Sequence, residues 1–141
     1  MGLFDALAIS GSGLTAQRLR MDVIADNLAN AQTTRSENGG PYQRRIVVFQ
    51  ERNFAHLLAN RLTPGGGVRV AAVTTDSAPP RLVYDPGHPD AGPDGYVRYP
   101  NINPVTEMVD MLVASRVYEA NVVAMETTRQ LALRTLELLR G

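Results

Sequence analysis

Residues 104–140 of this chain read PVTEMVDMLVASRVYEANVVAMETTRQLALRTLELLR, and this stretch decides the fold. Its apolar side chains recur at alternating spacings of three and four, the pattern of an amphipathic helix of coiled-coil type. Ser115 and Arg129 interrupt the stripe, whose apolar members are Met108, Met111, Tyr118, Val122, Met125, Ala132, Leu136 and Leu139. A second stripe from Val109 to Leu138 runs beside it, so the apolar arc is wide enough for more than one helical neighbour.

The amino-terminal segment carries a similar repeat, from Leu3 to Asn30. Its members recur every seven residues with Ile24 beside them, and they are Leu7, Leu14, Met21 and Leu28. The unusual feature is Ser10-Gly11-Ser12-Gly13, because each interior glycine costs a helix about 1 kcal/mol relative to alanine. Since the repeat keeps its register across these residues, we expect one continuous helix in which small residues allow close packing.

The region between the two repeats is short and broken by Gly and Pro. β-branched and aromatic residues predict strands at 42–50, 68–75 and 81–84, in a small antiparallel sheet or hairpin. The segment 85–95 predicts a turn-rich connection, since three prolines and three glycines fall within it. Asn103 suits the N-cap of the last helix, with proline at the first helical position.

These patterns predict a fold that is mainly α with a small β-rich middle region. The two long terminal helices would pack as a coiled-coil-like hairpin in an elongated subunit of a helical assembly. At about 1.5 Å per residue the helices would be roughly 40 and 57 Å long. We expect one structural unit with three parts, an N-terminal helix at 1–34, a middle region at 35–98 and a C-terminal helix at 99–141. Core helices of an ordinary small domain are the alternative interpretation.

Composition limits the classes of function. The 14 basic residues are all arginine and balance 14 acidic residues, which argues against a nucleic-acid partner because such binding needs a basic surplus. No uninterrupted apolar run approaches about 18 residues, so we expect no transmembrane segment. The N-terminus lacks the basic start and apolar core of a cleavable secretory signal.

Groups able to perform catalysis are sparse. The chain has no cysteine and two histidines, His56 and His88. His88 lies among prolines in residues 86–90, at a spacing that matches no common metal site, so a turn with local hydrogen bonds is expected there. Glu107 and Asp110 are expected at solvated helix positions. We therefore predict no catalytic, metal or cofactor-binding residues and no cofactor, and regard a small enzyme as a weak alternative.

Two motifs resemble one protein family. Residues 10–17 (SGSGLTAQ) and 20–34 (RMDVIADNLANAQTT) resemble the amino-terminal signature of the bacterial flagellar axial proteins of rod and hook. That signature has an Asn-rich helix end, here Asn27 and Asn30, and then a Thr turn, here Thr33 and Thr34. One departure is Asp26, where the family usually has a second Asn.

Further segments narrow the resemblance to the proximal rod proteins of the basal body. These segments are 41–45 with 48–50, 85–91, 95–103 with Asn101 and Asn103, and 107–109 with 114–121. The general signature places Gly-Tyr soon after the Thr turn, whereas this chain has RSEN at 35–38. That departure agrees with the shorter proximal rod members.

The resemblance implies a structural subunit that polymerises through its terminal helices into the drive shaft, which transmits torque from the rotor ring to the distal rod and hook. It implies as partners further copies of the chain, other proximal and distal rod proteins, the rod-to-rotor-ring adaptor and the flagellar type III export apparatus. It places the protein in the periplasmic part of the basal body, exported without a cleaved signal peptide.

The two heptad stripes, including Ile24, are the predicted intersubunit contacts. The helix end at Asn27 and Asn30 would cap and orient the turn toward a neighbouring subunit, and an ordinary local cap is the alternative. Two other functions stay open, namely another short rod subunit and a non-flagellar helical adaptor that dimerises through its coiled-coil seams.

Overall fold

The computed structural model describes residues 2–37, 39–52 and 66–140, and the chain within them is mainly helical with two small sheets. The elements follow in the order α1 (Leu3–Ala29), β1 (Arg45–Glu51), β2 (Val68–Thr75), β3 (Arg81–Tyr84), β4 (Tyr96–Tyr99) and α2 (Pro104–Arg140). This confirms the predicted fold class. His56 lies outside the described residues.

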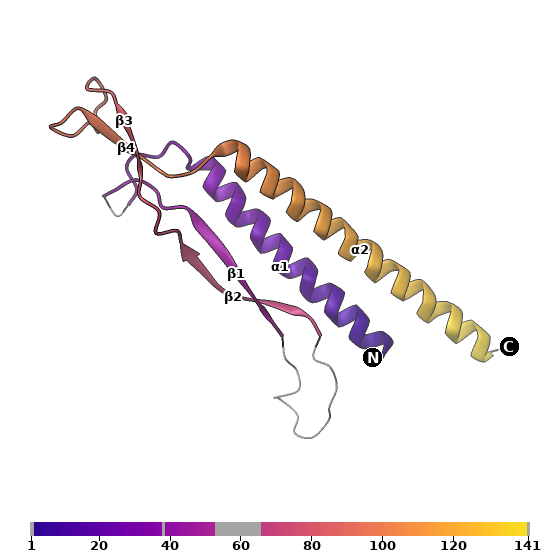
Figure 1. The fold of residues 1–141 in the computed structure, drawn as a ribbon. Coiled ribbons are helices and arrows are strands. Elements are labelled where there is room, and N and C mark those ends of the chain that lie inside the picture. Colours follow the sequence, from indigo (N-terminus) through magenta and orange to yellow (C-terminus); the bar gives the residue numbers. More distant parts are fainter. Residues whose placement is uncertain (1, 38, 53–65, 141) are drawn as a thin grey trace.

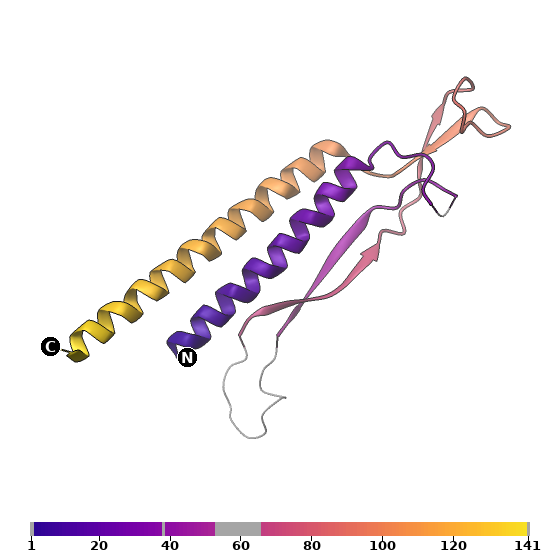
Figure 2. The ribbon, with the colours of Figure 1, turned by 180° about the vertical axis from the view of Figure 1, so that it is seen from behind.

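Three layers run side by side along the long axis of the molecule. α1 lies between α2 on one side and the β1–β2 hairpin on the other, and it contacts both (Figure 1). The two helices are antiparallel, so that the two ends of the chain lie at the same end of the molecule (Figure 2). α2 has 37 residues and is therefore about 56 Å long. The predicted elongated shape is confirmed.

The register of the helix pair leaves part of α2 without α1 beside it. Asn27 meets Glu107 near one end of the pair, and Gly13 lies against Asn121 further along. At this register Leu3 lies level with Leu131, so the last turns of α2 extend beyond the start of α1 (Figure 1). We call residues 132–140 the overhang.

The four strands form two antiparallel hairpins, β1–β2 and β3–β4. The predicted strands at 68–75 and 81–84 are confirmed, but the first strand begins at Arg45 rather than at Tyr42. The preceding residues run past the end of α1 instead, where the backbone N–H of Tyr42 donates to Thr33 O at 3.0 Å. β4 was not predicted, because it forms mainly by pairing with β3, a contact that local sequence does not specify.

α1 is continuous through Gly11 and Gly13, as predicted. Asn103 accepts a hydrogen bond from the backbone N–H of Val105 at 3.0 Å, and α2 begins at Pro104, which confirms the predicted N-cap. Within the described residues, neither helix combines the length and the apolar character needed to cross a bilayer. Among the described residues the buried apolar side chains are few, namely Ala16, Val23, Ile24, Ala31, Val97, Pro100, Ile102 and Ala114.

Candidate assembly surface

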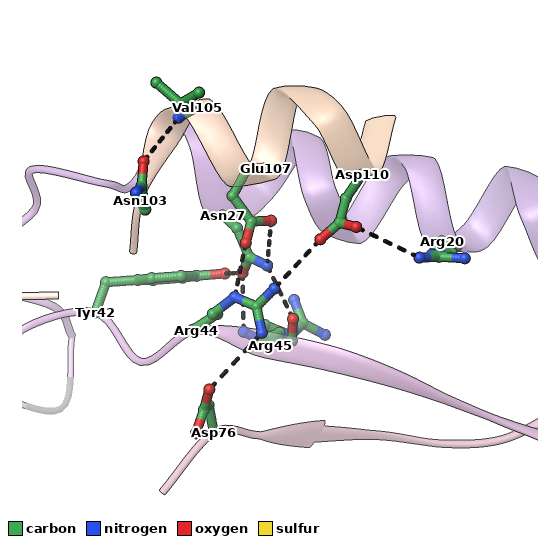
Figure 3. Close-up of polar contacts among 10 residues, drawn as sticks. All are labelled: Arg20, Asn27, Tyr42, Arg44, Arg45, Asp76, Asn103, Val105, Glu107 and Asp110. Carbon is green, nitrogen blue, oxygen red and sulfur yellow. Dashed lines mark hydrogen bonds and ion pairs between the residues drawn. The ribbon is translucent and has the colours of Figure 1, made fainter. Parts of the chain in front are cut away.

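A buried polar cluster joins α1 to α2 at the end of the pair nearest β3–β4 (Figure 3). Glu107 and Asn27 are each 1% exposed. Glu107 accepts hydrogen bonds from Arg44 Nε at 2.6 Å and from Asn27 Nδ2 at 3.2 Å. The prediction of a solvated Glu107 is therefore wrong. Glu107 lies four residues before Met111, so the three-and-four spacing of the seam turns it toward α1.

Arg44 connects this cluster to further carboxylates on α2 and after β2. Besides Glu107, its guanidinium lies 3.7 Å from Asp76 Oδ2 and 3.7 Å from Asp110 Oδ2. Asp110 also lies 3.8 Å from Arg20 of α1. A guanidinium has five donors in a rigid fork, so a single arginine can hold several carboxylates at once. The approach to β1, the segment after β2 and both helices are thereby tied together.

Asn27 uses its whole amide inside the chain. Its Nδ2 donates to Arg45 O at 2.9 Å, while its Oδ1 accepts from Arg45 N at 2.8 Å and from the Tyr42 hydroxyl at 3.2 Å. Burial raises the pKa of Tyr42 above its ordinary value, because desolvation disfavours the phenolate. Asn27 thus fixes the first residue of β1 against α1.

The other residues of the Asn and Thr signature make local contacts. Asn30 ends α1 as its C-cap and donates from Nδ2 to Asp26 O at 2.9 Å, while the Thr33 hydroxyl donates to Asn30 Oδ1 at 3.1 Å. Thr34 donates to Asp90 Oδ2 at 2.7 Å, which holds the turn to the β3–β4 connection. Asn101 is exposed. Orientation of this turn toward a neighbouring subunit stays a prediction.

The small residues of α1 allow close approach on two sides. A Cβ on Gly13 would lie 2.9 Å from Asn121 Oδ1 of α2, which is closer than real Cβ atoms come, so the helices meet there backbone against side chain. On the other side of α1, the Ser12 hydroxyl accepts from the backbone N–H of Val68 at 3.0 Å. The Ser-Gly-Ser-Gly motif therefore seats α1 between α2 and the start of β2.

The structure divides the predicted seam residues into two groups. Ile24 is buried and most of the others are half-buried along the helix pair, namely Leu7, Leu14, Met21, Leu28, Met111, Tyr118 and Met125. Met108, Val122, Leu136 and Leu139 are exposed. The first group holds α1 and α2 together within the chain. Contacts of either group with other subunits stay a prediction.

Exposed apolar side chains of the second stripe form a long surface along one side of α2. Residues spaced three, four or seven apart share one side of a helix. The exposed residues on this side, which we call the uncharged face, are Val109, Val113, Val117, Ala120, Ala124, Leu131 and Leu138. Helical spacing places Arg116 and Arg134 along one edge of this face, while Glu119, Glu126 and Glu137 lie further round the helix.

No cluster of acid, base or metal-binding groups accompanies this surface. Among the described residues, no three His, Cys, Asp or Glu side chains lie close enough together to hold a metal ion. His88 accepts a hydrogen bond at Nδ1 from the backbone N–H of Asp90 at 3.1 Å, within the turn expected there. The layered helices and exposed apolar faces define a subunit built for assembly.

Comparison with known proteins identifies that class as the flagellar rod. The family described as "Flagella basal body rod protein" matches residues 7–35, and the "Flagellar basal body rod FlgEFG protein C-terminal" family matches residues 94–138. These two matches fall mainly on α1 and on β4 with α2.

Full-length relatives narrow the class further. The chain is similar to proteins named flagellar basal-body rod protein FlgC from Borreliella burgdorferi (43% identity, all of both chains), Bacillus subtilis (44%, 98% of this chain and 99% of the relative) and Escherichia coli O157:H7 (44%, 98% of each). The chain belongs to the FlgC family of flagellar basal-body rod proteins. Its function is that of a structural subunit of the basal-body rod.

Proposed function

We propose that this chain polymerises through α1 and α2 into the proximal rod, the drive shaft that carries torque from the rotor ring to the distal rod and hook. The segments 1–34, 35–98 and 99–141 act in it as one structural unit. The proposal assigns no enzymatic activity. Stiffness comes from close helix packing, which the contact between Gly13 and Asn121 supplies within each subunit.

The observation that carries this proposal is the uncharged face of α2. Monomeric proteins rarely expose long contiguous apolar surfaces, and those that do use them for contacts with other molecules. Val109, Val113 and Leu131 are 53%, 47% and 54% exposed along one side of a single helix. Covering each such side chain stabilises the assembly by about 1.5–3 kcal/mol at most, before the costs of association.

The partners and the location of the chain in the cell follow from this role. The partners are further copies of this chain, other proximal and distal rod proteins and the adaptor between rod and rotor ring. The rod portion containing the chain lies in the periplasmic space. The chain reaches it through the flagellar type III export apparatus without cleavage of a signal peptide. Long helices that become ordered through contacts with other subunits would permit such export.

A helical adaptor that dimerises through its seams is the competing function. Light scattering on the purified chain separates the two. A discrete dimer of fixed mass would favour the adaptor, while a monomer that forms filaments at higher concentration favours the rod.

The decisive experiment places a charge on the uncharged face. Val113→Asp should change the free energy of unfolding of the isolated chain, measured with urea, by less than about 0.5 kcal/mol, because the site is exposed in the free chain. Cells carrying only this variant should lack complete rods and motility. Gln130→Asp is the matched control, since it places the same carboxylate at an exposed position about 100° around the helix from Val113. Normal rods in the Val113→Asp strain would contradict the proposal.

A further inference from the structure

Arg98 of β4 is an exposed arginine in the part of the chain where the β3–β4 hairpin joins the helix pair (Figure 1). Its guanidinium forms no ion pair and no hydrogen bond with any of the described residues. Arg44, by contrast, is paired with Glu107 within the chain. A guanidinium binds a carboxylate through two parallel hydrogen bonds. Arg98 is therefore available to a carboxylate of another molecule.

Two hollows in the surface meet at Arg98. The first has a volume of about 450 Å³ and lies between the approach to β1, the segment after β2 and the end of β4. The second has a volume of about 670 Å³ and lies between the turn after α1 and the β3–β4 hairpin. Gly40 and Pro41 also line both hollows, so the two are neighbours. We call the two hollows together the arginine groove.

Hydrogen bonds within the chain hold the walls of the arginine groove. The backbone N–H of Asp76 donates to Arg44 O at 2.7 Å, which fixes the segment after β2 against the approach to β1. The bond from the Thr34 hydroxyl to Asp90 fixes the turn after α1 against the β3–β4 connection. Little ordering is needed before a partner binds, and this lowers the cost of binding.

The lining of the groove defines the kind of segment that it suits. Leu82 lies opposite Arg98 in the strand register, and Leu82 and Tyr96 are both exposed. Tyrosine and arginine are among the residues enriched at the energetic centres of protein interfaces. Prolines supply further apolar contacts without backbone N–H donors, and they are Pro41, Pro80, Pro89, Pro93 and Pro100. The groove suits an extended segment that carries one carboxylate beside apolar residues.

The charges of the groove argue against a membrane surface as its occupant. Asp76, Asp90 and Asp94 line the groove together with its arginines, and the chain as a whole carries no net charge. A surface with many negative charges attracts clusters of several basic residues. One available guanidinium among three carboxylates instead favours a single carboxylate.

The described residues include all 14 acidic side chains, and these offer no fitting segment from a second copy of the chain. Three lie in α1 and five in α2. A helix is about 10–12 Å wide with its side chains, whereas the larger hollow has the volume of a cube about 9 Å on edge. Glu51 is paired in β1. The other five lie in segments that wall the groove itself, and they are Glu37, Asp76, Asp85, Asp90 and Asp94.

We propose that the arginine groove binds an extended segment of a different protein of the rod, and that a carboxylate of this segment pairs with Arg98. Apolar residues beside that carboxylate would contact Leu82 and Tyr96. The inference rests on the proposed function, because it assigns one surface of the subunit to a partner other than its own copies.

Photo-cross-linking in isolated rods tests this contact. The photoreactive amino acid p-benzoylphenylalanine takes the place of Tyr96, the rods are irradiated, and mass spectrometry identifies the linked products. We expect a product that joins this chain to a different protein, at a segment that contains Asp or Glu. Arg98→Glu should reduce this product about tenfold, because the carboxylate of the partner would then be repelled.

Arg81→Glu is the matched control. Arg81 is another exposed arginine of the hairpin, but its Cζ lies 5.5 Å from the centroid of the Tyr99 ring, and it is not among the described residues that line the groove. We expect as much product from this variant as from the natural chain. Exchange of the linked carboxylate for arginine in the partner should restore the product in the Arg98→Glu strain, also if Arg98→Glu alone keeps the chain out of rods.

The outcomes separate this inference from the proposed function. A product between two copies of this chain, a product with lipid, or no product from rods that contain the chain would overturn the inference and leave the rod function intact. Equal loss of product in Arg98→Glu and Arg81→Glu, or failure of the exchanged pair to restore it, would show that Arg98 does not bind the carboxylate. Absence of the natural chain from isolated rods would contradict the proposed function itself.

Discussion

The two ends of the helix pair are built in opposite ways. Near β3–β4, Asn27 and Glu107 are buried, and each side-chain oxygen and nitrogen of the two has a hydrogen-bond partner within the chain. At the far end, α2 extends past α1, and Leu136 and Leu138 are 57% and 83% exposed. At the first end the polar groups are buried and hydrogen-bonded within the chain, whereas at the second end apolar side chains of α2 are exposed; we call these the closed end and the open end.

This difference indicates how an assembling subunit can fold in one register and still bind neighbours. A buried, fully hydrogen-bonded polar group disfavours every other register, since a shift would leave Glu107 or Asn27 without partners. Apolar contacts specify register less strictly, so they suit the end that other subunits cover. The predictions below test whether substitutions at the two ends differ in this way.

The largest effect on the isolated chain is expected from Glu107→Ala. Removing this carboxylate leaves Arg44 and Asn27 with lost partners in a buried site, and we expect the free energy of unfolding to fall by about 3 kcal/mol. Urea unfolding followed by circular dichroism measures it. Glu119→Ala, at an exposed position of the same helix with a surface ion pair to Arg116, should cost less than about 1 kcal/mol. Equal costs for the two variants would show that the buried contacts of Glu107 add no stability.

The close approach of the helices gives the next effect. Gly13→Leu should destabilise the chain by about 2 kcal/mol, because the added side chain must displace Asn121. Gly11→Ala is the contrasting change, since its Cβ would lie 3.5 Å from Met125 Cε in ordinary contact. That variant should gain up to about 1 kcal/mol from helix propensity. Thermal unfolding of both variants checks the opposite signs.

Tyr42 predicts a smaller, pH-dependent effect at the closed end. Burial raises its pKa above the ordinary value of 10.0, so the folded chain holds the phenolic proton more tightly than the unfolded chain does. The resulting stability is fully present below about pH 10 and is lost as the pH rises through the folded pKa. Tyr42→Phe should lose about 1 kcal/mol at neutral pH and show a weaker decline above pH 10. If the variant lost stability above pH 10 as steeply as the natural chain, groups other than Tyr42 would cause that loss.

The smallest effect on the isolated chain is expected at the open end. Leu136→Asp should change the free energy of unfolding by less than about 0.5 kcal/mol, because the side chain already faces solvent. The same variant should nevertheless abolish motility, which a swarming assay in soft agar measures. A large loss of stability in the free chain would mean that Leu136 is packed against other residues of the same chain.

Much of the fold could be predicted from periodicity. The spacing of apolar residues predicted both helices, and the register from Leu7 to Leu14 correctly predicted continuity through the two glycines. β2 and β3 were predicted with their bounds because Gly and Pro flank them. β4 was missed since Tyr96–Tyr99 forms a strand mainly by pairing with β3, a contact that local sequence does not specify.

The polar cluster could not be predicted in the same way. Glu107 was expected in solvent because a carboxylate in the first turn of a helix is ordinarily exposed. Its burial depends on Arg44, which is 63 residues away in sequence. The one local signal was its position four residues before Met111, on the extended line of the seam. The apolar stripes, by contrast, could be predicted, but which members face α1 depends on the register of the pair.

Hydrogen exchange measured residue by residue tests the contrast between the ends most directly. In the isolated chain, amides of α2 near Glu107 and Ala114 should be protected, while those from Leu133 to Leu139 should exchange much faster. In isolated rods the second group should become as protected as the first. Equal protection of both groups in the free chain, or continued fast exchange from Leu133 to Leu139 in rods, would contradict an open end completed by neighbouring subunits.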